Sequence, residues 1–426
     1  MSQPGTGPAR ERGPESPQGG WRVPFVRPDV PEFSAVAADF EAAISSGLLT
    51  KGPQLQRLEE EAAAALGVRH VVGVSSCTLG LTLVLESLAE VRHRRATGCP
   101  AAGRCPLPAG GAESDRHEVI LPSFNFLAAP AAVVWAGFDP VFVDVDPDTF
   151  TIDPAAVAAA VTPHTAAIMA CHTFGCPCDL RALEAIAGRA GVPLVVDAAH
   201  GLGTLSGGRH VGAGGLAQVF SLSPTKLVVA GEGGLVATDC DCLADLVRIA
   251  REYGNDGQYG CRIPGLNARL PELSAILARS SLARLGDVSA RRREAAAAYV
   301  ETLADLPGIG FQAIPPGATS SWKDFSISVD PGRAALGRDA LRSRLAAAGI
   351  DTRAYYSPAC HQMEAFRGHL RPGTRLPVTE RLAATLLSLP MGAHVPPDVA
   401  RWIGREIRAA LGHATIGPAL PASVSR

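Results

Sequence analysis

The sequence is short of lysine: only Lys51, Lys226 and Lys323 stand against thirty-six arginines in 426 residues. Arginine stays protonated in proteins, whereas a lysine amine can lose its proton and act as a nucleophile or a base. Because arginine has replaced nearly every lysine whose role is only to be positive, each remaining lysine is a candidate for neutral-amine chemistry. The alternative is that a compositional bias spared three lysines by chance.

The composition also lacks the marks of several other protein classes. No apolar run reaches the roughly 18 residues that a membrane span needs. The formal net charge is −2, so bulk electrostatics suggest neither a nucleic-acid nor a membrane partner. The first twenty residues are rich in Pro, Gly and Ser without an apolar core, which predicts a disordered extension and not a signal peptide. We therefore expect a cytoplasmic protein.

Ten cysteines in a chain of this length do not indicate a disulfide framework. The segment nearest to a metal motif is Cys176-Pro-Cys178 with His172 close by, but its spacing is not the C-x-x-C repeat of zinc sites. We expect reduced thiols and no bound metal.

The order of apolar patterns predicts an α/β fold. Short β-branched segments alternate with Ala- and Leu-rich amphipathic segments from about residue 45 to 255, which is typical of a mainly parallel sheet covered by helices. We predict a sheet of seven strands. The expected strands are 70–74, 118–121, 141–145, 167–170, 193–197, 218–222 and 234–238, and the expected helices are 78–93, 128–136, 180–190, 242–252 and 271–285.

The pattern changes at residue 287, where a long Arg- and Ala-rich segment predicts a helix that leads into a smaller α+β domain. The resulting organisation is a disordered extension over 1–20, a large domain over 21–286, a small domain over 287–412 and a disordered tail over 413–426. The elements expected in the small domain are helices at 287–306, 339–348, 379–388 and 397–411, and a strand at 325–329.

One segment fits neither domain. Residues 92–117 begin with Arg-His-Arg-Arg and continue with Cys, Pro, Gly and Ala with little periodicity. Connections between a helix and the next strand usually take two to six residues. We therefore predict a surface insertion, either a disordered excursion or a lid or partner contact.

Two residues at the ends of predicted strands suit pyridoxal phosphate chemistry. Asp197 ends the strand 193–197, and a carboxylate at that end of a parallel strand points into the crevice where such sheets bind ligands. Lys226 follows the strand 218–222 after a polar turn and precedes a glycine-rich return. In such enzymes a lysine forms a Schiff base with the cofactor, and a carboxylate keeps the pyridine nitrogen protonated. Asp197 could instead cap a helix.

A phosphate group needs donors, and the segment Ser75-Ser76-Cys77-Thr78 can provide them. It lies between the first predicted strand and a helix, so hydroxyls and free backbone N–H groups meet at a helix N-terminus, which favours an anion. Ser221, five residues before Lys226, could add another hydroxyl. Taken singly, these residues could equally be ordinary helix caps.

Several motifs in order make the sequence resemble a known family, the DegT/DnrJ/EryC1/StrS aminotransferases, which are pyridoxal phosphate enzymes of fold type I. The resemblance runs from about residue 23 to the end of the small domain. The motifs are Ser-Ser-Cys-Thr78, Leu-Pro-Ser-Phe-Asn-Phe126, Phe142-Val-Asp-Val-Asp146, His172-Thr-Phe-Gly175, Asp197-Ala-Ala-His200, Phe220-Ser with Lys226 and Gly-Glu-Gly-Gly234, and Gly265-Leu-Asn267-Ala-Arg269.

The resemblance implies a role for each residue that matches a family position. Lys226 would form the Schiff base with pyridoxal 5'-phosphate, and Asp197 would bind the ring nitrogen. Thr78, the amide of Leu79 and Ser221 would bind the phosphate.

Three further roles follow from the same resemblance. Phe126 would stack on the cofactor ring, although an aromatic in the core is the alternative. His200 would lie beside the ring and act in catalysis. Asn267 would reach the phosphate of a neighbouring subunit, which implies a homodimer with shared active sites, although Asn267 could instead cap the helix that follows it. The chain departs from the family at Cys77, where a glycine or another small residue is common.

The resemblance implies transamination from glutamate or glutamine to a ketone. Family members mostly aminate nucleotide-linked keto-deoxy sugars, in amino-sugar and antibiotic biosynthesis, and this is the function we expect. Tyr355 and Tyr356 resemble the family segment that lines the acceptor side, and Lys323 could meet a phosphate there. A strand end with a surface lysine is the alternative interpretation of this region.

Other functions within the family stay open. Some members aminate cyclitol ketones, and some were first thought to be regulatory, so a non-catalytic interaction protein is an alternative of another class. Related sugar 3-dehydratases have histidine in place of the Schiff-base lysine, and Lys226 argues against that reaction.

Overall fold

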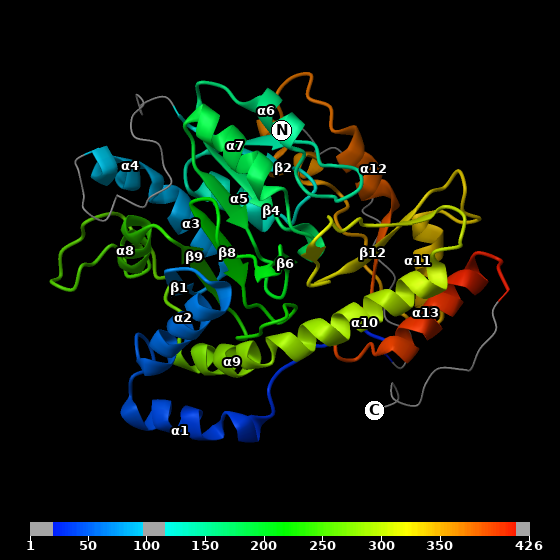
Figure 1. The fold of residues 1–426 in the computed structure, drawn as a ribbon, viewed down its shortest axis with the longest axis horizontal. Coiled ribbons are helices and arrows are strands. Elements are labelled where there is room, and N and C mark those ends of the chain that lie inside the picture. The colour runs from blue at the N-terminus through cyan, green and yellow to red at the C-terminus, as the bar shows by residue number, and fades with distance from the viewer. Residues whose placement is uncertain (1–19, 97–115, 415–426) are drawn as a thin grey trace, which may run out of the picture.

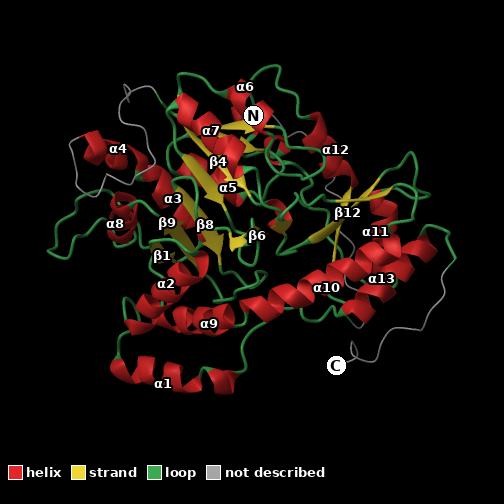
Figure 2. Ribbon diagram, in the orientation of Figure 1, coloured by secondary structure: helices red, strands yellow, loops and turns green. Residues whose placement is uncertain are grey.

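The computed structural model describes residues 20–96 and 116–414. Figures 1 and 2 show a larger body around a central sheet and a smaller body at the end of a long helix. The expected extension over 1–20 and tail over 413–426 lie almost wholly outside the described residues, and so does most of the expected insertion over 92–117. None of the helices in the described part is long and apolar enough to cross a membrane.

The central sheet has seven strands in the order β1-β9-β8-β5-β4-β2-β3. Strand β9 is antiparallel to both of its neighbours, and the other adjacent pairs are parallel. The predicted mainly parallel α/β sheet is therefore confirmed. Its strands are β1 (His70–Val74), β2 (Glu118–Pro122), β3 (Asp139–Val143), β4 (Thr165–Cys171), β5 (Leu194–Asp197), β8 (Ala217–Ser221) and β9 (Gly234–Thr238).

Alternating side chains of these strands bury two separate apolar layers, because successive residues of a strand point to opposite faces. In β2, Val119 and Leu121 belong to one buried cluster and Ile120 to the other. One face is covered by α3 (Cys77–Glu86), α4 (Leu88–Ala96), α5 (Ala128–Trp135) and α8 (Asp241–Ala250), and the other by α2 (Pro53–Leu66), α6 (Pro154–Ala160), α7 (Leu180–Ala190) and α9 (Glu272–Ala283).

A second body surrounds the antiparallel sheet β10-β12-β13. Helix α10 (Leu285–Leu303) leads the chain to it from α9 and packs along α13 (Pro397–Ala410) (Figure 1). Val23 near the first described residue pairs with Ile350 and is buried in the same cluster. The division of the chain at residue 287 stays a prediction. The remaining elements of this body are β10 (Ile309–Phe311), β12 (Phe325–Val329), β13 (Leu386–Leu389), α11 (Arg338–Ala347) and α12 (Pro377–Thr385).

A small third sheet joins the two bodies. Strand β11 (Ala318–Thr319) pairs with β6 (Leu205–Ser206), which in turn pairs with β7 (Arg209–His210). The segment that precedes β12 is therefore tied to the turn that follows β5. Helix α1 (Ala37–Ser46) packs on α9. Short 3₁₀ turns among the described residues occupy Phe33–Ala35, Thr173–Gly175, Cys360–Gln362 and Arg367–His369.

Two helix predictions need correction. The expected helix over 379–388 is wrong at its end, because α12 stops at Thr385 and the next four residues form β13 beside β12. The sequence Leu-Leu-Ser-Leu suits either state, and pairing with a strand distant in sequence decides between them. The expected helix over 78–93 is divided at Ser87, whose hydroxyl donates to the Leu83 carbonyl at 2.7 Å. Helices α1, α2 and α6 were not predicted.

Candidate active site

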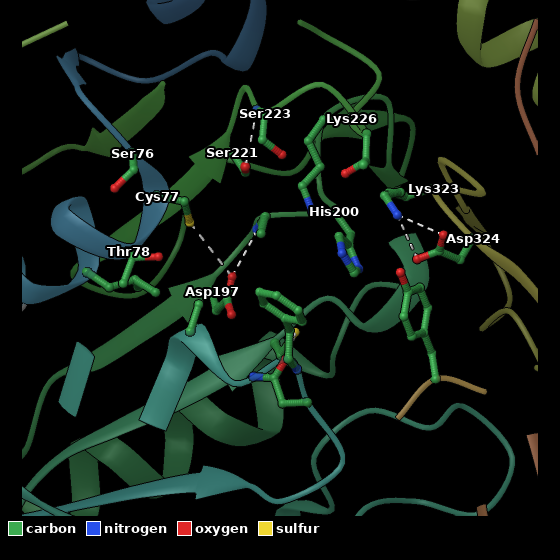
Figure 3. A pocket seen from close by; sticks show the side chains of 18 of the residues that line it. Ser76, Cys77, Thr78, Asp197, His200, Ser221, Ser223, Lys226, Lys323 and Asp324 are labelled. Carbon is green, nitrogen blue, oxygen red and sulfur yellow. Dashed lines mark hydrogen bonds and ion pairs between the residues drawn. The ribbon is translucent and has the colours of Figure 1, made fainter. Parts of the chain in front are cut away.

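A cavity of about 420 Å³ opens at the carboxyl ends of β5 and β8, beside the N-terminus of α3. This is the edge of the sheet where parallel α/β folds bind ligands. Side chains from several elements converge on it (Figure 3). The predicted site residues that line the cavity are Thr78, Phe126, Asp197, His200, Ser221, Lys226, Lys323, Tyr355 and Tyr356.

Asp197 is the last residue of β5 and is buried. Its Oδ1 accepts a hydrogen bond from the Ala199 N–H at 3.1 Å, and the residues that follow form turns, so the carboxylate does not cap a helix. Burial raises the pKa of Asp197, while the Ala199 N–H and the positive charge of Lys226 oppose the shift. A buried carboxylate of this kind is best stabilised by a cationic or N–H group of a ligand.

Lys226 lies in the turn after β8, and its backbone N–H donates to the Ser223 carbonyl at 3.0 Å. Burial of the side chain lowers the pKa of Lys226 to about 8, and the positive charge of Lys323 adds to the shift. A substantial fraction of the amine is therefore neutral near pH 8, as a nucleophile or base requires. Figure 3 shows the Lys226 side chain extending into the cavity toward His200.

His200 is buried next to the lysine and is uncharged. Its Nδ1 accepts a hydrogen bond from the Phe174 N–H at 3.2 Å, and its ring stacks on the Phe174 ring at 6.4 Å between centroids. Burial lowers the pKa of His200 well below its usual value, and the charges of Lys226 and Lys323 lower it further. Since Nδ1 accepts, the Nε2 atom of the neutral ring bears the proton.

The N-terminus of α3 forms the side of the cavity that suits an anion. Ser76 is the N-cap residue, and Thr78 lies in the first turn, where the N–H groups have no intrahelical partner. Strand β9 approaches this turn closely: a Cβ atom at Gly234 would lie 2.6 Å from the Cys77 nitrogen. Only glycine permits this approach, which brings Ser221, the partner of Gly234 in the ladder, beside the helix end.

The smaller body provides the opposite wall. Tyr355 stacks on Tyr356 at 5.3 Å, and Phe126, 50% exposed, lies 6.4 Å from the Tyr356 ring. Lys323 and Asp324 are both buried, and the Lys323 ammonium donates to both carboxylate oxygens of Asp324, at 2.7 and 2.9 Å. Lys323 is therefore neither the surface lysine of one interpretation nor a free cation.

Two predicted cofactor-binding residues do not line the cavity. The Leu79 N–H donates to the Ser76 hydroxyl at 3.1 Å, as in an ordinary N-cap. Asn267 is exposed and pairs with Glu252 in an isolated β-bridge. Its expected role requires a second subunit.

The sequence analysis missed several polar residues of the site, among them Asn125, Ser223 and Asp324. Asn125 lines the cavity, and its side chain opposes the rise that burial causes in the pKa of Asp197. Its place in the Leu-Pro-Ser-Phe-Asn-Phe126 motif, at the end of β2, was a usable signal. Asp324 was missed because an acid next to a lysine in sequence does not by itself predict a buried pair.

The thiols near the cavity are buried and protonated. Burial raises the pKa of Cys77 and Cys171 well above the usual thiol value. Burial also raises the pKa of Cys176 to about 12. Within the described ranges, no group of three or more His, Cys, Asp and Glu side chains is placed to hold a metal ion.

Comparison with known proteins identifies the family. The family model of the DegT/DnrJ/EryC1/StrS aminotransferases matches residues 34–408. The chain belongs to this family. It is an aminotransferase, and the predicted resemblance is confirmed.

Three relatives of this aminotransferase cover most of the chain. The dTDP-3-amino-3,4,6-trideoxy-α-D-glucose transaminase of Streptomyces venezuelae is 36% identical over 379 residues, which are 88% of this chain and 92% of the relative. The erythromycin biosynthesis sensory transduction protein EryC1 of Saccharopolyspora erythraea is 36% identical over 367 residues, 86% of this chain and 92% of the relative. The crystal structure of DesI with its TDP-sugar product has a TM-score of 0.80 at 36% identity and covers 91% of this chain and 93% of that chain.

Lys226→Arg is expected to abolish transamination and leave the fold intact, because arginine keeps the positive charge but provides no neutral amine. Turnover should fall to the background of the assay, while the circular dichroism spectrum and the melting temperature stay close to those of the wild type. Lys51→Arg, at an exposed lysine, is the matched control and should retain full activity. Measurable turnover by Lys226→Arg would refute the assignment of Lys226 as the reactive amine.

Proposed function

We propose that this aminotransferase uses pyridoxal 5'-phosphate to move an amino group from glutamate or glutamine to the keto group of a nucleotide-linked deoxy sugar. The main support is one arrangement: Lys226, Asp197 and the N-terminus of α3 surround the same cavity. A relative of this chain is named for a dTDP-linked amino sugar, and a similar structure contains a TDP-sugar product. We place the reaction in the cytoplasm, in amino-sugar or antibiotic biosynthesis.

The residues of the cavity fit this cofactor. Thr78, Ser221 and Ser223 with the first turn of α3 would hold its phosphate, and Asp197 would hold its ring nitrogen. The Asn125 side chain, beside Asp197, provides a further hydrogen-bonding group at the same wall of the cavity. When bound, pyridoxal phosphate supplies an aldehyde and an aromatic ring that accepts an electron pair.

The side chains then have distinct tasks. The Lys226 amine would hold the cofactor and, when free, would move a proton at the α-carbon of the amino donor. Asp197 keeps a proton on the ring nitrogen, since a buried carboxylate is stabilised by a positive neighbour. His200, uncharged and beside the amine, can donate a hydrogen bond from Nε2 without adding charge to the site. The exposed Phe126 ring is available for stacking.

The acceptor would enter from the side of the smaller body, along Tyr355, Tyr356 and Lys323. Burial raises the pKa of both tyrosines, so their hydroxyls are neutral and can donate to oxygen atoms of a sugar or a phosphate. A cyclitol ketone, which other members of the family aminate, is the second candidate acceptor. It has hydroxyl groups but no diphosphate.

We further propose a homodimer with shared active sites. Asn267 lies outside the cavity of its own chain and is exposed, so it is available to a neighbouring subunit. Large apolar side chains are exposed near the cavity and near the segment that contains Asn267. They include Phe126, Trp135 at 80% and Tyr259 at 98% exposure. Burial of such groups in a subunit interface would be favourable.

The test of the proposed function is a panel of nucleotide-linked keto-deoxy sugars and cyclitol ketones, offered with glutamate or glutamine. We expect amination of a nucleotide sugar, a visible absorption band of the bound cofactor, and fixation of the cofactor to the Lys226 peptide by borohydride. Amination of cyclitol ketones alone would support the second candidate. A colourless protein that does not bind pyridoxal phosphate would support a regulatory role, which the name of one relative suggests for that relative.

Asp197→Asn is expected to leave the cofactor bound but to slow both half-reactions at least tenfold. The neutral amide no longer stabilises the protonated ring nitrogen, and a tenfold loss corresponds to about 1.4 kcal/mol of barrier. Stopped-flow absorption of each half-reaction measures the effect. A loss of less than about tenfold would mean that Asp197 is structural and that another acid serves the ring.

Asn267 provides the test of shared sites. Asn267→Ala should weaken cofactor binding if its amide crosses the subunit interface. Mixed with an inactive Lys226→Ala chain, it should give heterodimers in which one site has both defects and the other has neither. Activity should therefore exceed the sum of the two parents after subunit exchange.

The control is each variant incubated alone under the same exchange conditions. If Asn267 only caps α9 within its own subunit, each substitution impairs the site of the chain that carries it, and mixing restores no activity.

A further inference from the structure

Two of the three lysines in this chain line the same cavity. Lys323 is 5% exposed and is paired with the buried Asp324. An arginine would form a bidentate pair with a carboxylate at least as well, and this chain uses arginine almost everywhere else. The pairing alone therefore does not explain why residue 323 is a lysine.

The backbone around Lys323 is held in an unusual conformation. Trp322 has a φ of 47° and Phe174 a φ of 58°, both in the left-handed region that non-glycine residues rarely adopt. The Lys323 N–H donates to the Phe174 carbonyl at 3.1 Å. Arg292 of α10 donates through Nη1 to the carbonyls of Trp322 and Lys323, at 2.9 and 3.0 Å. Conformations of this kind persist where the surroundings enforce them, and they gather at functional sites.

Ser321, two residues before Lys323, fixes this segment to the larger body. The Ser321 hydroxyl donates to the His200 carbonyl at 2.8 Å, and its N–H donates to the Thr204 hydroxyl at 3.3 Å. A Cβ atom at Gly175 would lie only 2.1 Å from the Ser321 hydroxyl oxygen, so the two segments are in close contact. The position of Lys323 relative to the turn after Asp197 is therefore set by direct contacts.

Several ionisable groups face the Lys226 amine. Cys77 of α3 is a protonated thiol and His200 an uncharged imidazole, since burial raises the pKa of the first and lowers that of the second. Asp197 contributes a negative charge from the end of β5. Glu232, in the glycine-rich return, lines the cavity and is exposed to solvent.

The remaining neighbours of Lys226 come from the smaller body. Tyr355 and Tyr356 are protonated, because burial raises the pKa of each. Lys323 and Asp324 bear opposite charges. Lys323 is thus the cation among the groups that line the cavity beside Lys226.

We propose that Lys323, held in place by Asp324, is a positioning residue whose buried ammonium favours the uncharged form of the Lys226 amine. This rests on the proposed function, in which the neutral amine of Lys226 acts as nucleophile and base. A lysine suits the role because a compact ammonium on a flexible stem brings one charge close to another amine, whereas a guanidinium spreads its charge.

The direction of the electrostatic effects agrees with this geometry. Burial makes the largest contribution to the lowered pKa of Lys226, and Lys323 is the charge that lowers it further. The negative charges of Asp324 and Asp197 act in the opposite sense. Without Lys323, the amine would bind its proton more tightly and would be neutral only at higher pH.

The test measures the protonation of Lys226 directly in the full-length, cofactor-free protein. Trace acetylation with acetic anhydride over a range of pH, followed by mass spectrometry, reports the neutral fraction of each lysine. We expect a midpoint near pH 8 for Lys226 in the wild type. In Lys323→Met the midpoint should rise by about one unit, a tenfold change in proton affinity, because the cation is lost and Asp324 is left to attract the proton.

Three controls accompany this variant. Lys323→Arg keeps a positive charge but spreads it over the guanidinium, so it should restore only part of the shift, and Asp324→Asn should move the midpoint downward. Lys323→Met with Asp324→Leu removes the whole pair, so no unpaired buried charge endangers folding, and should give a smaller rise. The exposed Lys51 is an internal reference that should not change.

An unchanged or lowered midpoint of Lys226 in both Lys323→Met and the double variant would overturn the proposal. The failure of the proposed function would be seen elsewhere, as the absence of borohydride-fixed cofactor on Lys226, while the acetylation titration would still give a result.

Discussion

The site depends on two groups of opposite charge that share a cavity: Asp197, which is buried, and Lys226, which is partly buried. Asp197 ends β5, and Lys226 lies in the turn after the neighbouring strand β8. The two side chains form no ion pair within the part of the chain that the structure describes. Each is costly to bury alone, since a charge removed from water needs a partner. Part of this stabilisation would come from a ligand that contacts Asp197 at one point and the Lys226 amine at another. Three features keep the space between Asp197 and the Lys226 amine open. They are the strand β11, which pairs with β6, the glycine at 234, and the N-cap of α3.

In the proposed function, the chemistry and the choice of substrate are divided between the two bodies. The larger sheet provides Asp197, Lys226 and the hydroxyls at the end of α3, and the smaller body provides the two tyrosines and the Lys323–Asp324 pair. Figure 3 shows Lys323 and Asp324 on the other side of the cavity from Asp197 and Thr78. The contact between them passes through Ser321 and the turn after β5, so any rotation of one body against the other would alter the environment of the reactive amine.

The sequence predicted the parts of the site that depend on strand order. The carboxyl ends of parallel strands meet at one edge of a sheet, and this was enough to bring Asp197, Ser221 and Lys226 together. It did not predict the pairing of Asp324, the contact of Ser321 with the His200 carbonyl, or the strand at 386–389. These depend on contacts between segments distant in the chain, which local propensity does not contain. Scarcity of lysine marked Lys226 and Lys323, which both line the cavity, but it also marked Lys51, which is exposed and pairs with Glu252 at 3.5 Å.

The antiparallel strand β9 has a consequence for how such enzymes can evolve. Because β8 and β9 are neighbours, the connection over 222–233 is a hairpin loop, closed by the hydrogen bond from the Leu222 N–H to the Gly233 carbonyl at 2.9 Å. This one loop determines the positions of Lys226, of Ser221 before it, and of Gly234 after it, which allows the close approach of α3. An insertion there would displace the amine and the anion site together, so lineages that diverge in substrate are constrained to keep its length. Side chains on the smaller body are not subject to this constraint, so single substitutions there can change which acceptor binds.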